Sequence, residues 1–267
     1  MNILDKIVER KIVEVNQLKN SESYTSLEKS DYFGIPTKNL SKNILQNQIS
    51  IIAEHKRKSP SKKEINFTSK TKDIVLGYEQ HGAVGISVLT DEYFFGGSKK
   101  DLKIVKEACS IPILRKDFII DEFQIIESKS IGADAILLIA AILTKNQISN
   151  FSRIAKELGL NVLTEIHSID ELQKCDLKNI DIVGVNNRDL KSFEVDINNS
   201  INISKHIPSE MVKISESGIE NPRDIKNLMN EGFDGFLIGE RFMKSENPGI
   251  SLKEFIEETK WLLKSVV

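Results

Sequence analysis

GADAILLIAAILTKNQISNFSRIAKELGLNVLTE, residues 132–165, contains the pattern that decides the fold. Two short runs rich in apolar and β-branched residues, 135–139 and 161–165, flank a longer run in which apolar residues recur at helical spacing. Thr144 is a suitable cap for the start of that helix, and Gly159 supplies its stop. The stretch therefore predicts a strand, a helix and a second strand, the unit from which parallel sheets are built.

The same unit repeats along the chain from residue 50 onward. Further helices are expected at 99–108, 121–130 and 222–231, and the eight expected strands are 50–56, 83–89, 112–117, 135–139, 161–165, 180–186, 211–216 and 235–238. Eight strand–helix units in about 220 residues favour a closed (β/α)8 TIM barrel of the α/β class. Periodicity alone does not exclude an open, doubly wound sheet.

Residues 1–48 precede the first expected strand. They are expected to form one or two helices packed on the barrel, because apolar residues fall near helical spacing at Ile3, Leu4, Ile7, Val8, Ile12, Val15 and Leu18. No linker or low-complexity tract divides the chain, so we expect one domain, 1–267.

The composition excludes several classes of partner. The 267 residues include 37 Lys and Arg against 39 Asp and Glu, so no global charge favours nucleic acid or an anionic membrane. No run approaches the ~18 apolar residues of a membrane span, and the N-terminus lacks the apolar stretch of a secretory signal. Cys109 and Cys175, in stretches expected to be helical, lack disulfide or metal spacing. We expect free thiols and a cytoplasmic protein.

Charged residues interrupt the strands at their carboxyl ends, where barrels of this kind build active sites. By the alternation of side chains along a strand, several should point into the barrel mouth, namely Glu54, Lys56, Lys116, Glu165 and Glu216. His167 shares the face of Glu165, and Asn186 and Arg188 follow the sixth strand. Any single one could be a solvated charge, but three carboxylates and two ammonium groups in one mouth are costly unless paired or used.

Glycines follow the seventh and eighth strands, where barrels commonly bind phosphate. Ser217 and Gly218 precede one expected helix start, and Gly239 and Glu240 precede another. Glycine lets backbone amides approach an anion, although each glycine alone could be a simple turn. Ser59 lies in the basic loop after the first strand, which neighbours the eighth in a closed barrel. Together these residues predict a phosphate site.

The motifs resemble, in order along nearly the whole chain, those of the indole-3-glycerol-phosphate synthase family. They are AEHKRKSPS at 53–61, LTDEYFFGGS at 89–98, ILRKDFIIDEFQ at 113–124, GADAILLI at 132–139, LTEIH at 163–167, GVNNRDL at 184–190, SESGI at 215–219 and LIGERFM at 237–243. The ordered set is far more specific than any one motif. The family also carries a helical extension before its barrel.

The resemblance implies a carboxy-lyase of tryptophan biosynthesis that needs no cofactor or metal. Its substrate would be 1-(2-carboxyphenylamino)-1-deoxyribulose 5-phosphate, converted into indole-3-glycerol phosphate, carbon dioxide and water. Lys116 would be the general acid for the ketone, and Glu165 the general base of the dehydration, with Glu54 nearby. Lys56 would contact the substrate carboxylate. The residues themselves do not decide whether Lys116 or Lys56 protonates the ketone.

The resemblance also implies the remaining roles. Asn186 and Glu216 would orient hydroxyl groups and catalytic groups, and Arg188 would bind the anthranilate carboxylate. The phosphate binders would be Ser59, Ser217, Gly218, Gly239 and the backbone of Glu240. The apolar wall around the benzene ring would consist of Leu89, Phe95, Phe118, Leu137, Ile139 and Leu190.

Two positions depart from the family pattern. Lys62, Lys63 and Glu64 follow the SPS motif where the family commonly has a glycine, which leaves the mobility of that loop open. Arg241 stands where a small residue is usual, and we expect it to point to solvent rather than to bind phosphate.

Two alternative functions remain at this point. Phosphoribosylanthranilate isomerase shares the phosphate site but has a cysteine base at the end of its first strand, where this chain has Glu54 and Lys56. A non-catalytic barrel that binds a phosphorylated ligand is disfavoured by the complete set of acid, base and phosphate residues. We expect a monomeric enzyme that acts on a phosphorylated small molecule.

Overall fold

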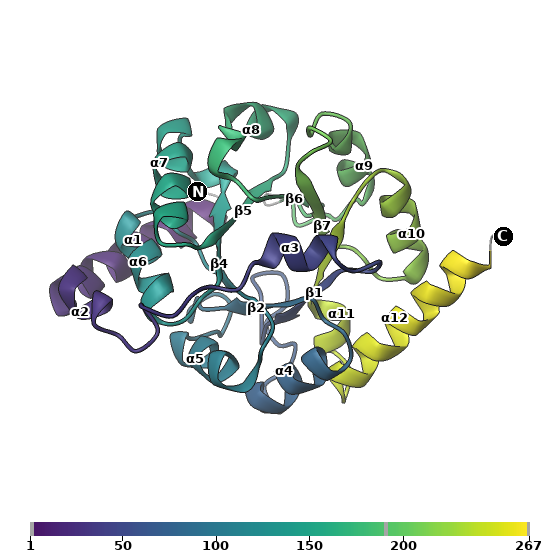
Figure 1. Cartoon of the computed structure of the whole chain (residues 1–267), viewed down its shortest axis with the longest axis horizontal. Coiled ribbons are helices and arrows are strands. Elements are labelled where there is room, and N and C mark those ends of the chain that lie inside the picture. The colour runs from purple at the N-terminus through teal and green to yellow at the C-terminus, as the bar shows by residue number, and fades with distance from the viewer. Residues whose placement is uncertain (1–2, 190–191, 266–267) are drawn as a thin grey trace.

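Eight parallel strands form a closed barrel in which every strand pairs with the next and β8 pairs with β1 (Figure 1). The computed structural model describes residues 3–189 and 192–265. The strands are β1 Ile51–His55, β2 Gly85–Leu89, β3 Ile113–Lys116, β4 Ala135–Ile139, β5 Asn161–Ile166, β6 Ile182–Asn186, β7 Val212–Glu216 and β8 Gly235–Ile238. The predicted (β/α)8 barrel is confirmed, and the open sheet is excluded.

Helices between the strands, together with two that follow β8, cover the outside of the barrel. They are α4 Thr71–Gln80, α5 Lys99–Ala108, α6 Glu122–Ser130, α7 Lys145–Glu157, α8 Ile169–Lys174, α9 Asn198–Ser204, α10 Pro222–Asn230, α11 Glu240–Met243 and α12 Pro248–Lys264, with short 3-10 turns η1 Ala140–Ile142 and η2 Leu177–Asn179. The Asp121 and Thr144 side chains accept hydrogen bonds from the first turns of α6 and α7. Within the described ranges, 3–189 and 192–265, no helix combines the length and apolar character that crossing a membrane requires.

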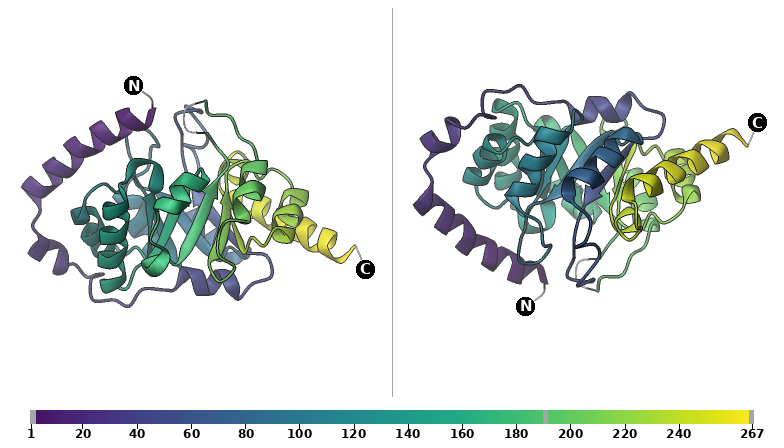
Figure 2. Two further views of the ribbon diagram at one scale, coloured as in Figure 1. Left: turned by 90° about the horizontal axis from the view of Figure 1, so that it is seen from above. Right: turned by 90° about the horizontal axis from the view of Figure 1, so that it is seen from below.

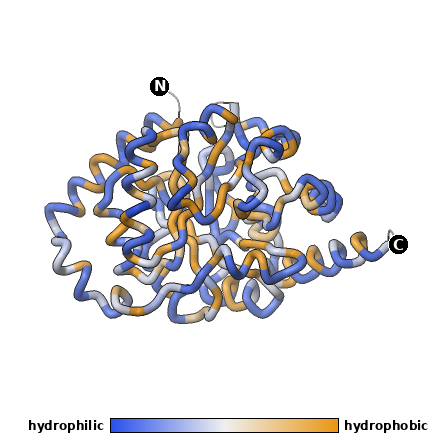
Figure 3. Tube along the Cα trace, turned by 45° about the horizontal axis from the view of Figure 1, so that its top comes forward, coloured by the Kyte–Doolittle hydropathy of each residue, from blue (hydrophilic) through white to orange (hydrophobic). Residues whose placement is uncertain are grey.

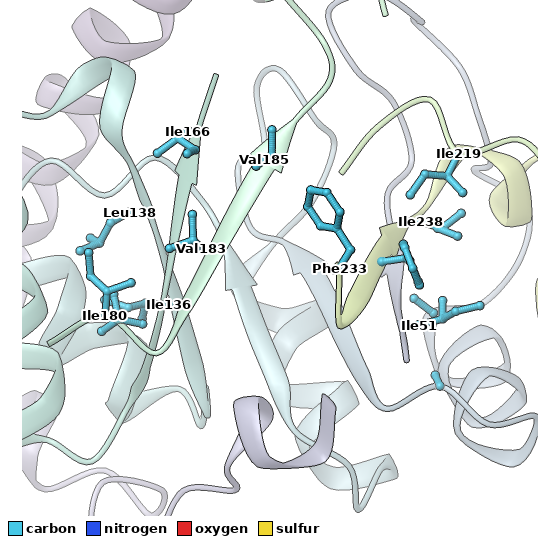
Figure 4. Packing of buried hydrophobic residues seen from close by; sticks show 14 of the residues in the cluster. Ile51, Ile136, Leu138, Ile166, Ile180, Val183, Val185, Ile219, Phe233 and Ile238 are labelled. Atoms are coloured by element: carbon cyan, nitrogen blue, oxygen red, sulfur yellow. The ribbon is translucent and has the colours of Figure 1, made fainter. Parts of the chain in front are cut away.

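Alternation along the strands divides the apolar residues between two layers. One set, including Leu114, Leu163 and Ile214, fills the barrel interior. The other packs strand residues such as Ile136 and Val183 against the helices (Figure 4). Hydrophobic and hydrophilic residues also alternate along the helices, as their single buried face requires (Figure 3). A rigid double layer therefore supports the strand ends.

The segment before β1 forms three helices rather than the expected one or two: α1 Ile3–Ser21, α2 Tyr24–Glu28 and α3 Leu40–Leu45. It runs from one end of the barrel along its side to the other (Figure 2). Ile3, Leu4 and Ile7 of α1 reach the mouth at the carboxyl ends of the strands. Leu40 and Ile44 of α3 close the opposite end, against the first residues of β2 and β8.

Candidate active site

A cavity of about 410 Å³ opens at the carboxyl ends of the strands. Every site residue predicted from the sequence lines it, except Leu190, which lies outside the described residues. Strand register explains much of this convergence. Lys116 lies beside Leu89, Glu165 beside Ile139, and Glu216 beside Asn186, each pair on adjacent strands.

The three carboxylates and two ammonium groups at the mouth form two separate ion-paired clusters. Lys116 Nζ is 2.7 Å from Glu165 Oε2 and 2.9 Å from Glu216 Oε2. Lys56 Nζ is 2.6 Å from Glu54 Oε1. All three carboxylates are buried, so the ammonium groups supply the compensating charge that burial demands.

Two glycines make room for these carboxylates. A Cβ at Gly184, within β6, would collide with the carboxylate of Glu216. A Cβ at Gly239, after β8, would lie 2.6 Å from Glu54 Oε1. The sequence indicated Gly239 only as a phosphate residue and gave Gly184 no role, although a glycine inside an apolar strand often marks a close approach.

The charges of this cluster are set by burial and by the shared lysine. Burial lowers the pKa of Lys116, but Glu165 and Glu216 outweigh it and the pKa is raised, so the ammonium form persists. Burial raises the pKa of Glu165, but Lys116 and His167 outweigh it and the pKa is lowered. For Glu216 burial prevails and the pKa is raised. The site therefore holds an ammonium donor next to an ionised carboxylate.

Four of the five predicted phosphate residues directly follow β7 and β8 in the cavity lining, and the fifth, Ser59, comes from the loop after β1. Ser217 and Gly218 both have positive φ, 67° and 77°. Such a conformation costs a serine about 1 kcal/mol or more, and residues strained in this way cluster at functional sites. A Cβ at Gly218 would collide with Val195, so glycine is required there. Gly239 directly follows β8 and lines the same cavity.

Charged side chains surround this subsite at its rim. The Glu240 carboxylate contacts Lys244 at 2.6 Å, Lys62 at 3.4 Å and Arg188 at 3.9 Å. Lys62 belongs to the loop after β1, so this ion pair ties the loop to the subsite. The expectation that Arg241 points to solvent is wrong. Its guanidinium lies 4.9 Å from the centre of the Phe255 ring, because α12 covers this side of α11.

The predicted apolar residues form the opposite wall. The rings of Phe95 and Phe118 have centroids 5.8 Å apart. The sequence did not assign a site role to Ile3, Leu4 and Ile7 of α1, which add to this wall. The sequence shows that these residues form one apolar face of a helix. It does not show that this face packs toward the barrel mouth, because that depends on tertiary packing.

A family model described as indole-3-glycerol phosphate synthase matches residues 4–255. The chain belongs to this family. Membership of the indole-3-glycerol phosphate synthase family makes it a carboxy-lyase of tryptophan biosynthesis.

Relatives named indole-3-glycerol phosphate synthase are similar over 85% or more of their length. One from Bacteroides thetaiotaomicron is 43% identical over 256 residues, covering 96% of this chain and 98% of the relative. One from Thermoanaerobacter pseudethanolicus is 42% identical over 261 residues, covering 97% and 98%. One from Prochlorococcus marinus is 44% identical over 254 residues, covering 91% and 85%.

Solved structures of low sequence identity share the fold. Thiamine phosphate pyrophosphorylase from Pyrococcus furiosus matches with a TM-score of 0.60 and 14% identity, over 84% of this chain and all of that chain. A structure titled "Native KDPGal structure" matches with a TM-score of 0.58 and 11% identity, over 82% and 97%. At these identities the likeness supports the barrel alone.

One buried network that the sequence did not indicate links the family's N-terminal extension to the site. Lys11 Nζ of α1 lies 3.0 Å from both Asp91 Oδ2 and Asp117 Oδ1. The other oxygen of Asp91 accepts a hydrogen bond from the backbone N–H of Phe95, and Asp117 Oδ1 accepts one from that of Phe118. One lysine thus joins the two loops that carry the aromatic wall.

Proposed function

We propose that this chain converts 1-(2-carboxyphenylamino)-1-deoxyribulose 5-phosphate into indole-3-glycerol phosphate, with Lys116 as general acid and Glu165 as general base. The observation that carries the proposal is the 2.7 Å contact between Lys116 Nζ and Glu165 Oε2. It lies in a cavity whose lining also includes Gly218, Gly239 and the aromatic pair Phe95 and Phe118. Acid, base, phosphate subsite and apolar wall are what the reaction requires.

Ring closure needs a proton donor at the ketone. The ring carbon that bears the carboxylate attacks the ketone carbon, and Lys116 gives a proton to the ketone oxygen as the new bond forms. The carbon–carboxylate bond then breaks, carbon dioxide leaves, and its electron pair restores the aromatic ring. Lys116 is suited to the first step because its neighbours keep it protonated.

Loss of water completes the indole. Lys116, reprotonated from solvent after ring closure, gives a second proton to the hydroxyl formed from the ketone, which leaves as water, while Glu165 removes a proton from the neighbouring methylene carbon. Glu165 is available as a base because Lys116 and His167 lower its pKa and keep the carboxylate ionised. Each proton is given or taken by a residue of this chain, so the proposal needs no cofactor or metal.

The other residues hold a flexible substrate in its folded, reactive shape. Lys56 and Arg188 would bind the carboxylate, Lys56 being held by Glu54 at 2.6 Å. Asn186 and Glu216 would orient hydroxyl groups beside Lys116. The phosphate would bind to Ser59, Ser217, Gly218, Gly239 and the Glu240 backbone, and the benzene ring would lie against Leu89, Phe95, Phe118, Leu137, Ile139 and Leu190.

We further propose that residues 1–267 act as one domain and as a monomer in the cytoplasm. The cavity lining is drawn from α1 and from the barrel of a single chain, which supports the first two points. Cys109 and Cys175 are free thiols, which suits a reducing compartment.

The test is to supply the purified chain with the proposed substrate and follow the fluorescence of indole-3-glycerol phosphate together with released carbon dioxide. We expect the two products in equal amounts. Glu165→Gln should lower kcat at least ~100-fold, the usual worth of a positioned base, with an unchanged thermal unfolding curve. Absence of product from the wild-type chain would contradict the activity, and a wild-type rate in Glu165→Gln would contradict the role of the base.

A further inference from the structure

A histidine that the reaction scheme above does not use lies beside the proposed base. His167 directly follows β5 and shares the face of Glu165, and its side chain is 13% exposed. Its Nε2 is 3.6 Å from Glu165 Oε1 and has no hydrogen-bond partner among residues 3–189 and 192–265. A buried polar atom without a partner, aimed at a catalytic group, calls for an explanation.

Glu171 orients the His167 ring from the side opposite Glu165. Glu171 Oε2 lies 3.3 Å from His167 Nδ1 and also accepts a hydrogen bond from the His167 backbone N–H at 2.7 Å. Glu171 is itself placed by Ser168, whose hydroxyl accepts from the Glu171 N–H at the start of α8. With Nδ1 bound to a carboxylate, Nε2 is the nitrogen directed at Glu165.

The two oxygens of Glu165 therefore face different cations. Oε2 contacts Lys116, and Oε1 faces His167. Lys116 must give its proton to the substrate, and at that moment it stops neutralising Glu165. A carboxylate buried without a cation tends to take up a proton, which would disable the base.

We propose that His167, as an imidazolium, is a positioning residue that keeps Glu165 ionised and oriented while Lys116 serves the substrate. The inference rests on the proposed function of Glu165 as base. The charged groups facing His167 are Glu165 of β5, Glu171 of α8 and Glu216 of β7, with Lys116 on the far side of Glu165. Burial lowers the pKa of His167, but Glu171 and Glu165 outweigh it and the pKa is raised, which favours the imidazolium.

The test is the pH dependence of kcat in His167→Gln, whose amide can still donate a hydrogen bond but carries no charge. Removing a cation beside Glu165 raises the pKa of that carboxylate, so the acid limb of the profile should move up by about 1 pH unit or more. We expect kcat to fall about 10-fold at pH values on that acid limb, with the gap closing at higher pH, where Glu165 is ionised in both proteins. KM should change little, because the phosphate subsite and the apolar wall are untouched.

Two further variants make the test specific. Glu171→Gln lies outside the cavity lining and releases the His167 ring, so it should move the acid limb in the same direction. His206→Gln, at an exposed histidine, should leave the profile unchanged. A purely structural role for His167 would lower the active fraction equally at every pH and would overturn the proposal, as would wild-type acid limbs in both His167→Gln and Glu171→Gln. Wild-type turnover in the same assay separates these outcomes from failure of the proposed function.

Discussion

At the scale of single residues, one lysine has to serve two buried carboxylates. Lys116 contacts both Glu165 and Glu216, yet one ammonium neutralises only one negative charge. The outcome is asymmetric, because the pKa of Glu165 is lowered and that of Glu216 is raised. When the pKa values of two neighbouring carboxyl groups shift in opposite directions, one group is ionised and can act as a base. The other can carry a proton, although both are glutamates.

Strand alternation was enough to predict which charges would enter the cavity. Lys116 and Glu165 lie at or next to the carboxyl ends of β3 and β5, whose alternating apolar residues fix the face to which each side chain points, so their direction follows from the sequence. The roles of Gly184 and Lys11 could not be predicted in the same way. Each depends on which residue from a distant segment lies opposite, Glu216 in one case and Asp91 with Asp117 in the other.

At the scale of elements, the extension before β1 connects both ends of the barrel. Its number of helices was mispredicted, because α2 and α3 are too short to show a hydrophobic period. Their caps are nevertheless in the sequence. Ser23 forms a capping box at α2, and Asn39 accepts a hydrogen bond from the first turn of α3. Cap signals are thus more informative than periodicity for helices of five or six residues.

The link between α1 and the barrel should depend strongly on Lys11. Lys11→Met leaves Asp91 and Asp117 buried without their shared cation, and we expect a loss of about 3 kcal/mol in the free energy of unfolding. Lys19→Gln is the matched control, since Lys19 joins the same helix to Asp121 through an ion pair at 2.6 Å that is 37% and 29% exposed. It should cost less than about 1 kcal/mol. Urea denaturation measures both, and equal losses in the two variants would argue against the buried network.

At the scale of the whole molecule, closure distinguishes this fold from an open sheet. The spacing of strands and helices predicted eight strand–helix units but could not show whether the first and last strands pair. The pairing of Ile51 with Phe236 joins the first strand to the last and brings Ser59 to the same cavity as Gly239. That step depends on the twist of the complete sheet, which no local segment of the sequence specifies.

The stability of the barrel should fall in mild acid because of His55. This residue of β1 is 1% exposed, and neither ring nitrogen has a hydrogen-bond partner in the described part of the chain. Burial, and then Arg57, lower its pKa to about 4. The unfolded chain therefore binds one more proton than the folded chain between pH 6.5 and 4, and up to about 3 kcal/mol of stability is lost as the pH falls through this window.

His55→Leu should remove that part of the pH dependence. The raised pKa of Glu216 has the opposite effect on the pH dependence of stability. The contribution of His55 is therefore the difference between wild type and variant in the slope of the free energy of unfolding against pH. Urea denaturation at pH 4.5 and 6.5 measures the difference. Identical slopes in the two proteins would show that the folded state protonates His55 as readily as the unfolded chain does.

The most direct test of the catalytic assignment compares Lys116→Met with Lys56→Met in the fluorescence assay for indole-3-glycerol phosphate. If Lys116 protonates the ketone, its replacement should lower kcat at least ~100-fold. Lys56 is paired with Glu54 and assigned to the substrate carboxylate, so Lys56→Met should mainly raise KM. Circular dichroism serves to check that both variants are folded. A near wild-type kcat in Lys116→Met, with the large loss in Lys56→Met instead, would contradict the assignment.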